Sequence, residues 1–251
     1  IPTYNRHHLL GRTLRHYDGF GVPVLVVDST PVPFTDLEGL ANTQYLHVPD
    51  EPMPHKLRAP VLERVRTPYM VMSADDSFTC LSGIRSCVEF LEANPDYSSA
   101  HGYYLGFWDR GGDIELDVYY RSLENLETVV DSDRPQERLI QHFTRYNCIF
   151  YATFRTSCMA ETLSRFPDVI RNYCIMEFYF AMMQIVHGKH KLLPRRQPSA
   201  MWTHQRPSAT TCTGWPPSPG TSRSSTPTWR PWPRIWPRRA GGPCTKRAST
   251  S

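Results

Sequence analysis

The sequence lacks any run of about 18 consecutive apolar residues, the length that a helix needs to cross a bilayer. It also lacks a Cys-x-x-Cys pair, and its seven cysteines are an odd number. A zinc site and a complete disulfide framework are therefore not expected, and free thiols suit a reducing compartment. Because no secretory signal is visible, we expect a soluble protein of the cytoplasm, at most held at the inner face of the membrane.

Acidic residues are missing from residues 201–251. The same stretch holds eight of the 28 lysines and arginines, nine of the 23 prolines and five of the six tryptophans. Residues 1–200 consequently carry a net charge of −4, although the whole chain carries +4. A mildly acidic body without clustered basic residues argues against a nucleic-acid partner.

Residues 196–251 form a basic, Pro/Trp/Arg-rich tail without helical or strand periodicity. Proline at this density removes backbone donors and favours an extended chain. A membrane-surface arm, giving peripheral membrane contact, and a polyproline ligand are two functional interpretations. The composition is also what a shifted reading frame in GC-rich DNA gives. We expect an irregular tail, disordered or frameshifted, and a folded domain at 1–195 whose first strand lacks residues before Ile1.

Helical and strand patterns alternate along residues 1–195. Leu9, Leu10 and Leu14 recur at helical spacing, and the apolar run 23–28 ends in an acid and a turn, as a buried parallel strand does. The alternation predicts an α/β fold with a Rossmann-like, mostly parallel sheet flanked by helices. The expected helices are 6–20, 56–65, 82–94, 135–146, 157–166 and 171–187, and the expected strands are 23–28, 43–48, 67–73, 100–108, 114–120 and 148–153, with a hairpin turn at Gly111-Gly112.

Carboxylates follow two of the expected strands. Asp28 ends the strand 23–28, and Asp75 and Asp76 follow the strand 67–73. In an open α/β sheet the carboxyl edge is the ligand crevice, and two or three carboxylates there can hold a divalent ion that neutralises a diphosphate. For Asp28 alone, turn chemistry explains the residue equally well. Two adjacent acids repel each other unless a positive group lies between them, which favours the functional interpretation of Asp75 and Asp76.

Three segments resemble the opening of a family 2 glycosyltransferase: Ile-Pro-Thr-Tyr-Asn-Arg at 1–6, Val-Leu-Val-Val-Asp-Ser at 24–29 and Thr-Pro-Tyr-Met-Val-Met-Ser-Ala-Asp-Asp at 67–76. The segment 137–147, followed by Phe150-Tyr-Ala, resembles a bacterial subgroup of these enzymes. The resemblance covers about residues 1–194. It implies the GT-A fold, a nucleotide-diphospho-sugar donor and inversion at the anomeric carbon.

The resemblance also implies a donor site. Pro2, Thr3, Tyr4 and Arg6 match the family's loop around the nucleotide, and Asp28 matches the acid that hydrogen-bonds the base. These five residues are therefore expected to bind the nucleotide-sugar.

A metal motif is implied in part. Asp75 and Asp76 match the first two positions of a DXD-type motif that holds Mn²⁺ or Mg²⁺, and Asp75 is expected to contact the donor as well. Ser77 stands at the third position, where the motif has an acid, and a neutral hydroxyl is a poor ligand for a hard cation. Either Asp76 or Asp75 then holds the metal, or metal binding is weakened.

An inverting transfer needs a general base that deprotonates the acceptor hydroxyl. By position, Glu177 resembles the family's late acidic residue, and its apolar neighbours, such as Ile175 and Phe178, favour that role. A helix acid facing solvent is the alternative interpretation. Asp168 is the second candidate for the base.

Further residues have two interpretations each. Lys56, in the pair His55-Lys56, is a candidate phosphate ligand or an ordinary exposed lysine. His187 and His190 suggest a metal site, but a favourable contact with a helix end explains them better. An aromatic cluster is either a platform for a sugar ring or packing, and it comprises Tyr103, Tyr104, Phe107 and Trp108.

The sequence thus predicts a hexosyl-type glycosyltransferase that uses a nucleotide-diphospho-sugar and Mn²⁺ or Mg²⁺. Its acceptor is a hydroxyl on a growing polysaccharide, a lipid or a protein. A nucleotidyltransferase is disfavoured because no Gly-rich basic loop follows the first strand. The alternative from another class is a catalytically impaired nucleotide-sugar-binding relic, suggested by Ser77 and by the tail.

Overall fold

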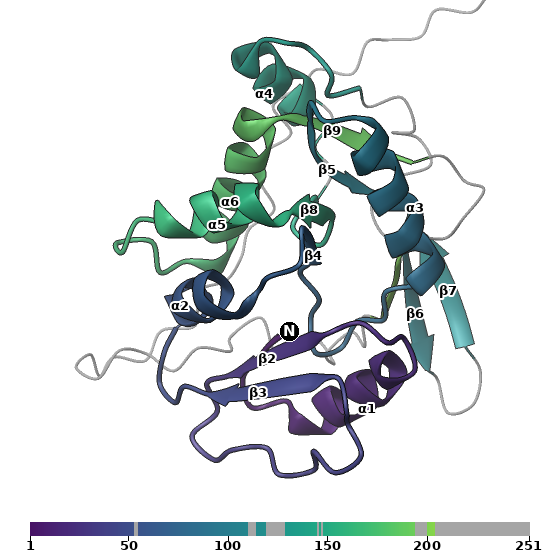
Figure 1. Cartoon of the computed structure of the whole chain (residues 1–251), viewed down its shortest axis with the longest axis vertical. Coiled ribbons are helices and arrows are strands. Elements are labelled where there is room, and N and C mark those ends of the chain that lie inside the picture. Colours follow the sequence, from purple (N-terminus) through teal and green to yellow (C-terminus); the bar gives the residue numbers. More distant parts are fainter. Residues whose placement is uncertain are drawn as a thin grey trace, which may run out of the picture. The chain divides into compact units, whose positions relative to one another are not determined.

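The structure is a computed structural model (Figure 1) that describes residues 1–52, 55–109, 114–118, 129–144, 146, 148–193 and 200–203. These residues all belong to one compact unit, Ile1–Pro207. The helices are α1 (His7–Asp18), α2 (His55–Arg64), α3 (Leu81–Ala93), α4 (Pro135–Thr144), α5 (Thr156–Ser164) and α6 (Tyr173–His187). The strands are β1 (Pro2–Thr3), β2 (Val24–Asp28), β3 (Thr43–His47), β4 (Tyr69–Val71), β5 (Tyr97–His101), β6 (Tyr104–Asp109), β7 (Ile114–Val118), β8 (Thr153–Arg155), β9 (Lys189–Leu192) and β10 (Ala200–Thr203).

The amino-terminal strands form a parallel sheet in the order β1-β2-β3. Its register places Thr3 beside Asp28, and Asp28 beside His47. The carboxyl ends of all three strands therefore meet at one edge, which is where the sequence predicts the ligand site.

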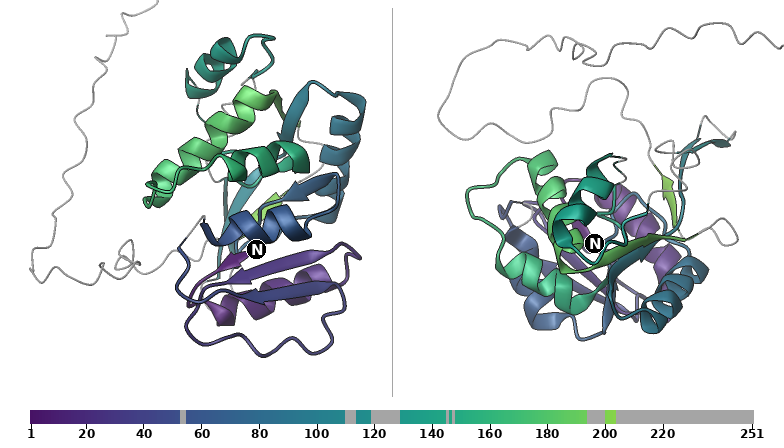
Figure 2. Two further views of the ribbon diagram at one scale, coloured as in Figure 1. Left: turned by 60° about the vertical axis from the view of Figure 1, so that its left-hand side comes forward. Right: turned by 90° about the horizontal axis from the view of Figure 1, so that it is seen from above.

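Helices α1 and α2 cover opposite faces of this sheet (Figure 2). Successive side chains of a strand point to opposite faces. Val26 of β2 packs with Leu10 and Leu14 of α1, whereas Val27 belongs to the core that contains Leu57 of α2. The sheet is thus buried on both sides, which is why β2 is a continuous apolar run.

A second, mixed sheet has the order β4-β8-β5-β9. Strand β8 runs antiparallel to both β4 and β5, while β5 and β9 are parallel. Strands β6, β7 and β10 form a third sheet, in which β6 pairs antiparallel with β7 and parallel with β10. Helices flank parallel strands as predicted, so the α/β class is confirmed.

The expected strand at 148–153 is wrong. Residues 148–152 form a turn, closed by a hydrogen bond of 3.0 Å from the backbone N of Ala152 to the backbone O of Ile149. The side chains of Cys148, Ile149 and Phe150 are nevertheless buried. A short apolar run does not distinguish a buried loop from a buried strand, and the strand β8 begins only at Thr153.

Other differences concern strands. The expected strand 100–108 is two strands, β5 and β6. Strand β9 was not expected after the last helix, because one of its two inward residues is His190 rather than an apolar residue. The tail, expected to be without strand structure, contains β10 near its start. The expected turn at Gly111-Gly112 lies outside the described residues.

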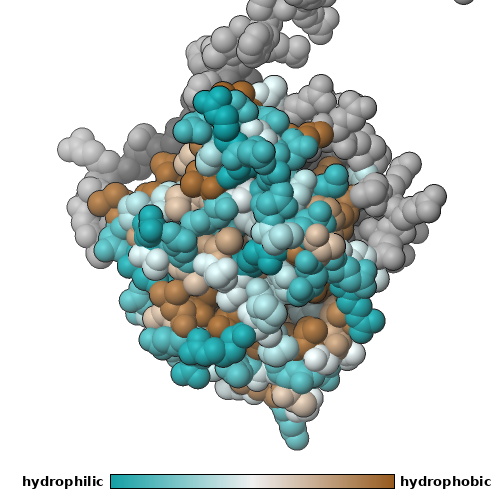
Figure 3. Space-filling model, turned by 45° about the horizontal axis from the view of Figure 1, so that its top comes forward, coloured by the Kyte–Doolittle hydropathy of each residue, from teal (hydrophilic) through white to brown (hydrophobic). Residues whose placement is uncertain are grey.

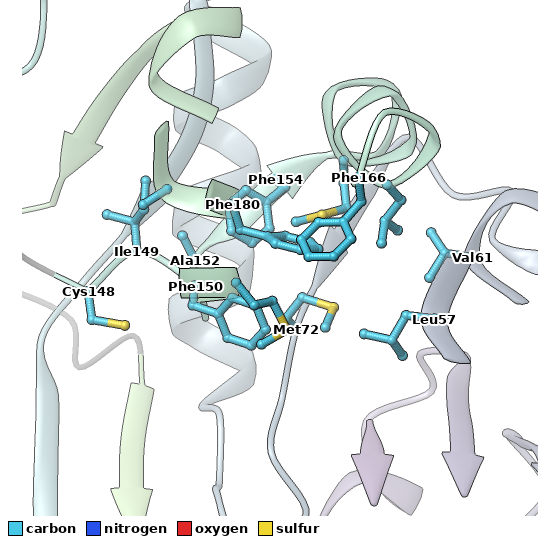
Figure 4. Packing of buried hydrophobic residues seen from close by; sticks show 14 of the residues in the cluster. Leu57, Val61, Met72, Cys148, Ile149, Phe150, Ala152, Phe154, Phe166 and Phe180 are labelled. Carbon is cyan, nitrogen blue, oxygen red and sulfur yellow. The ribbon is translucent and has the colours of Figure 1, made fainter. Parts of the chain in front are cut away.

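The largest hydrophobic cluster lies between α2, α5, α6 and the second sheet (Figure 4). Phe150, Phe154 and Phe180 are its largest members and are at most 2% exposed. The rings of Phe150 and Phe180 meet edge to face with centroids 5.5 Å apart. Because Phe150 comes from the 148–152 turn, this turn is part of the core.

Helix α6 carries an apolar outer face. Ile175, Phe178, Met182 and Val186 are all between 37% and 54% exposed. On the face of the molecule that Figure 3 presents, hydrophobic residues occur in separate groups among hydrophilic ones. No helix in the described part of the chain is both long and apolar enough to span a membrane.

Replacing Gly188 by Ala should lower the free energy of unfolding by about 1–3 kcal/mol. A Cβ at Gly188 lies 2.7 Å from the backbone N of Ser98 and 2.9 Å from the backbone O of Asp96. Gly19→Ala is the matched control, because no atom lies within 4 Å of its Cβ and its φ is −72°. Urea unfolding followed by circular dichroism measures both. Equal stability of the two variants contradicts the close approach at Gly188.

Candidate active site

The carboxyl edge of the β1-β2-β3 sheet gathers charged and hydroxyl side chains from four elements. Thr3 ends β1, Asp28 ends β2, and Lys56 lies near the start of α2. Asp75 and Asp76 follow β4 and are buried beside them. The structure therefore brings together residues that are up to 73 positions apart in the chain, between Thr3 and Asp76.

Like Asp28, Asp75 has no exposed surface. Its Oδ2 accepts hydrogen bonds from Oγ1 of Thr3 at 2.7 Å and from Nε of Arg6 at 3.2 Å. Its Oδ1 forms an ion pair with Nη2 of Arg6. Its backbone O accepts a bond of 2.7 Å from Oγ1 of Thr13 on α1. Burial raises the pKa of Asp75, and the charge of Arg6 and the bond from Thr3 offset only part of this effect.

Asp76 shares the same arginine. Nη1 of Arg6 donates to Oδ2 of Asp76 at 2.8 Å, and Oγ of Ser77 donates to Oδ1 at 3.2 Å. Three of the four carboxylate oxygens of the acidic pair thus accept hydrogen bonds from protein donors. The fourth, Oδ1 of Asp75, is buried without a hydrogen bond from the described residues and lies in the ion pair with Arg6. Ser77 bonds to its neighbour instead of extending a ligand set.

The expected Mn²⁺ or Mg²⁺ site does not fit this arrangement. A divalent ion needs several free oxygen ligands, whereas here three carboxylate oxygens already accept hydrogen bonds from Thr3, Arg6 or Ser77, and the fourth, Oδ1 of Asp75, is in an ion pair with Arg6. Within the described ranges, no group of three or more His, Cys, Asp or Glu residues is placed to hold a metal ion.

Asp28 has its own set of donors. Nε2 of His7 lies 2.7 Å from Oδ2, the hydroxyl of Tyr45 donates to Oδ2 at 2.6 Å, and the backbone N of Thr30 donates to Oδ1 at 2.8 Å. Burial opposes ionisation, but the bonds from Thr30, Tyr45 and His7 outweigh it and hold the pKa of Asp28 below its usual value. Asp28 is therefore a buried anion that fixes the His7 and Tyr45 side chains.

Lys56 is 3% exposed, so the interpretation as an ordinary surface lysine is wrong. Its Nζ donates to the backbone O of Thr3 at 2.7 Å and to Oγ of Ser29 at 2.9 Å. Burial lowers the pKa of Lys56 to about 8, although Asp28 and Asp75 favour its charged form. The lysine joins the ends of β1 and β2 from within the protein.

Glu177 lies on α6 and contacts the turn at 148–152. Its Oε1 accepts hydrogen bonds from Sγ of Cys148 at 2.8 Å and from the hydroxyl of Tyr146 at 3.3 Å. Burial raises the pKa of the Tyr146 hydroxyl, and Cys148 and Glu177 add to the effect. Both donors bind the same oxygen. Oε2 therefore has no protein donor in the described part of the chain.

Two tyrosines link Glu177 to the acidic pair. The hydroxyls of Tyr151 and Tyr173 are 3.2 Å apart. Burial, followed by the effects of Tyr173, Cys148 and Asp76, raises the pKa of Tyr151 well above its usual value. Tyr173 in turn interacts electrostatically with Glu177 and Arg6. The two tyrosines thus interact electrostatically with both Glu177 and the acidic pair with its arginine.

The remaining candidates lie in different settings. Pro2 is in β1 and Tyr4 follows it. Asp168, the second candidate for the base, is 77% exposed and pairs with Arg58 at 3.0 Å. Tyr103 and Tyr104 are buried, as packing predicts, and the side chains of Phe107 and Trp108 lie outside the described set.

The histidine pair of the sequence is split between two environments. His187 ends α6 and lies 3.6 Å from Glu161. His190 is buried in β9, where its ring nitrogens lie 2.7 Å from Oγ of Ser99 and 2.8 Å from Nδ1 of His101. The helix-end interpretation is compatible with His187 alone, and His190 is a satisfied core histidine.

Several site residues were missed by sequence reasoning. Tyr45 and His7 bind Asp28, and Cys148 and Tyr146 bind Glu177. His7 directly follows the segment 1–6, and Cys148 directly follows the segment 137–147, so adjacency to both segments was an available signal. No comparable signal marks Tyr45, whose hydroxyl reaches Asp28 only through the pairing of β2 with β3.

No protein-family model and no curated protein sequence matches the chain. Solved structures do resemble it. The structure of S. aureus TarS 1-349 matches with a TM-score of 0.56 and 14% identity, over 80% of this chain and 58% of that chain. A second S. aureus TarS structure matches with a TM-score of 0.55 and 13% identity, over 81% of this chain and 36% of that one. This chain therefore spans less than two thirds of the TarS chains.

A third structure is the mannosyltransferase PcManGT from Pyrobaculum calidifontis in complex with GDP-Man and Mn²⁺. It matches with a TM-score of 0.47 and 16% identity, over 83% of this chain and 56% of that chain. The TarS structures have the GT-A type of fold. The chain described here therefore has the GT-A type of fold that the sequence predicted.

Replacing Lys56 by Met should remove a pH dependence from the stability. The pKa of Lys56 is about 8 in the folded chain, below the usual 10.5. Between these values the unfolded chain binds more protons, so the free energy of unfolding of the wild type rises with pH, by up to about 1 kcal/mol per unit. In Lys56→Met this rise is absent.

Urea unfolding between about pH 8 and pH 9.5 measures the two slopes. Tyr45, whose pKa is raised to about 12, contributes a slope of opposite sign in both proteins, so their difference isolates Lys56. Lys191→Met, in β9, is the control and keeps the wild-type slope. Parallel curves for wild type and Lys56→Met contradict the buried setting of Lys56.

Proposed function

We propose that this chain is a glycosyltransferase that moves a sugar from a nucleotide-diphospho-sugar to an acceptor hydroxyl with inversion. The proposal rests on one observation above all. Thr3, Arg6, Asp28, Lys56 and the acidic pair converge at the carboxyl edge of a parallel sheet in a GT-A type fold. That edge is where open α/β sheets bind their ligands.

The donor lies at this edge in our proposal. Asp28 with His7 and Tyr45 forms a polar wall for the nucleotide base. Arg6, whose side chain is 44% exposed, faces the diphosphate. A guanidinium is planar and has five N–H donors, which suits phosphate oxygens.

Glu177 is the general base in this mechanism. The acceptor hydroxyl gives its proton to Oε2, which carries no protein donor within the described residues, while Cys148 and Tyr146 hold Oε1. The acceptor oxygen forms a bond to the anomeric carbon as the bond from that carbon to the diphosphate oxygen breaks. Attack from the face opposite the leaving group inverts the configuration.

A second candidate is a nucleotide-sugar-binding protein without turnover. It is favoured by Ser77, whose hydroxyl bonds to Asp76 where the motif has a third acid. Both candidates predict donor binding, and only the first predicts sugar transfer. For the first candidate we also propose an acceptor hydroxyl on a glycan, a lipid-linked molecule or a protein. We propose as well that this enzyme acts at the inner face of the membrane.

Calorimetry with UDP, GDP, CDP and TDP tests the donor site. We expect one nucleotide to bind, and Asp28→Asn to weaken its binding about tenfold or more, because the loss of the buried charge releases His7 and Tyr45. The exposed Asp36, which pairs with Arg15 at 3.7 Å, provides the control Asp36→Asn with unchanged affinity. Folded protein that binds none of the four nucleotides contradicts both candidate functions.

Glu177→Gln then tests the base. With sugar-bearing forms of the nucleotide that binds, transfer to an acceptor or to water should fall about 100-fold or more, while donor affinity stays within about twofold. Glu161→Gln is the control, since Glu161 lies on α5 and pairs with Arg165 at 2.8 Å. Wild-type protein that binds the donor without any turnover supports the second candidate, and equal rates in wild type and Glu177→Gln exclude Glu177 as the base.

A further inference from the structure

Arg6 lies at the centre of the acidic pair. Its Nε and Nη2 face the two oxygens of Asp75, and its Nη1 donates to Oδ2 of Asp76 at 2.8 Å. The remaining oxygen of the pair, Oδ1 of Asp76, accepts from Ser77. One guanidinium therefore occupies the position between two adjacent carboxylates that otherwise repel each other.

The arrangement resists replacement by a metal ion. A divalent ion at this pair has to displace a two-pronged Arg–carboxylate contact, which is among the strongest hydrogen-bonded pairs in proteins. It also leaves the displaced guanidinium without a carboxylate partner. In exchange the ion gains oxygens from Asp75 and Asp76 only, because Ser77 offers a neutral hydroxyl.

Arg6 retains capacity for a further anion. Two of its five N–H donors make hydrogen bonds, from Nε to Asp75 and from Nη1 to Asp76, while Nη2 is in an ion pair with Oδ1 of Asp75. Among the described residues, no acceptor makes a hydrogen bond with the other three N–H groups. The Arg6 side chain is 44% exposed, whereas the Asp75 side chain has no exposed surface, so the arginine is open to solvent where the aspartate is not.

A second cation supports the same side of the site. The buried Nζ of Lys56 donates to the backbone O of Thr3, and Arg6, three residues after Thr3, is the N-cap of α1. Asp28 and Asp75 interact with Lys56, and Arg6 does as well. The site thus carries two positive charges from side chains alone.

We propose that Arg6 is the resident cation of this site, and that the chain binds the diphosphate of a nucleotide through Arg6 without a divalent metal ion. The inference rests on the proposed function, because the nucleoside diphosphate is part of its donor. It differs from the metal dependence that the sequence suggested. In this proposal Arg6 offsets one of the two negative charges of the acidic pair and directs its remaining N–H donors at the leaving diphosphate.

The first experiment measures metal binding without any nucleotide. Free Mn²⁺ gives an electron paramagnetic resonance signal that disappears when the ion binds to protein. With an equimolar concentration of wild-type protein, we expect the amplitude of this signal to stay within about 10% of its value in buffer alone. The double variant Arg6→Ala with Ser77→Asp frees the carboxylates, adds a third acid and should bind Mn²⁺. Asp76→Asn in that background should abolish the binding. Circular dichroism confirms that each variant is folded.

The second experiment measures nucleotide binding by calorimetry, first with EDTA and then with Mn²⁺. The dissociation constant of the wild type should agree within about twofold in the two buffers. Arg6→Lys keeps the charge but loses the forked geometry, and it should weaken binding about tenfold. Arg15 lies on α1, is exposed and pairs with Asp36. Arg15→Lys is therefore the control and should leave the affinity unchanged.

The outcomes separate this inference from the proposed function. Depletion of the Mn²⁺ signal by wild-type protein that is lost in Asp76→Asn overturns the inference, and so does nucleotide binding that disappears with EDTA. Either result leaves the donor site in place. If no nucleotide binds in either buffer, the proposed function and the binding of a diphosphate by Arg6 are both wrong. In that case the Mn²⁺ signal still shows whether Arg6 or a metal ion occupies the acidic pair.

Discussion

The ion pair between Arg6 and Asp75 is the contact on which the candidate site depends. It joins the segment after β1 to the end of β4, which are 69 residues apart in the chain. Thr3 and Thr13 bond to the same aspartate, so its side chain and its backbone are both fixed from the first sheet and its helix. A buried carboxylate without a partner is costly. The loop after β4 is thus held at the carboxyl edge of the first sheet, where the donor is proposed to bind, and Asp76 is held with it.

Much of the fold was predictable because its first half obeys simple periodicities. The run at β2 ends in Asp28 as a buried parallel strand does, and Leu10 and Leu14 of α1 lie on the expected apolar face. The second half was harder. An apolar turn in the core looks like a strand in sequence, as residues 148–152 show, and a strand with an inward histidine, such as β9, hides its alternation. Both errors arise because burial, and not hydrogen bonding, determines the apolar pattern.

The candidate site was predictable to a different extent. The acids Asp28, Asp75 and Asp76 follow strands and could be located from the sequence, and the structure places them at one edge. Their partners could not. That a single arginine spans both Asp75 and Asp76 depends on the left-handed backbone of Asn5, with φ of 54°, and on its bond of 2.9 Å to Oγ1 of Thr30. Asn tolerates this conformation better than most residues. Such a local backbone geometry cannot be derived from spacing or charge.

The turn at 148–152 places Cys148 in hydrogen-bond contact with Glu177, and it also contributes Ile149 and Phe150 to the core. A single short segment therefore serves two purposes that are usually separated in enzymes, where variable loops hold the reactive groups and a rigid scaffold holds the loops. Evolution of this half of the site is constrained accordingly. Under the proposed role of Glu177 as the base, substitutions that suit a new acceptor have little freedom at 148–150, since each one also changes the packing around Phe180. Diversification of this proposed acceptor side is then expected to begin on the outer face of α6, at positions such as Ile175 and Phe178, where side chains change at little cost to the interior.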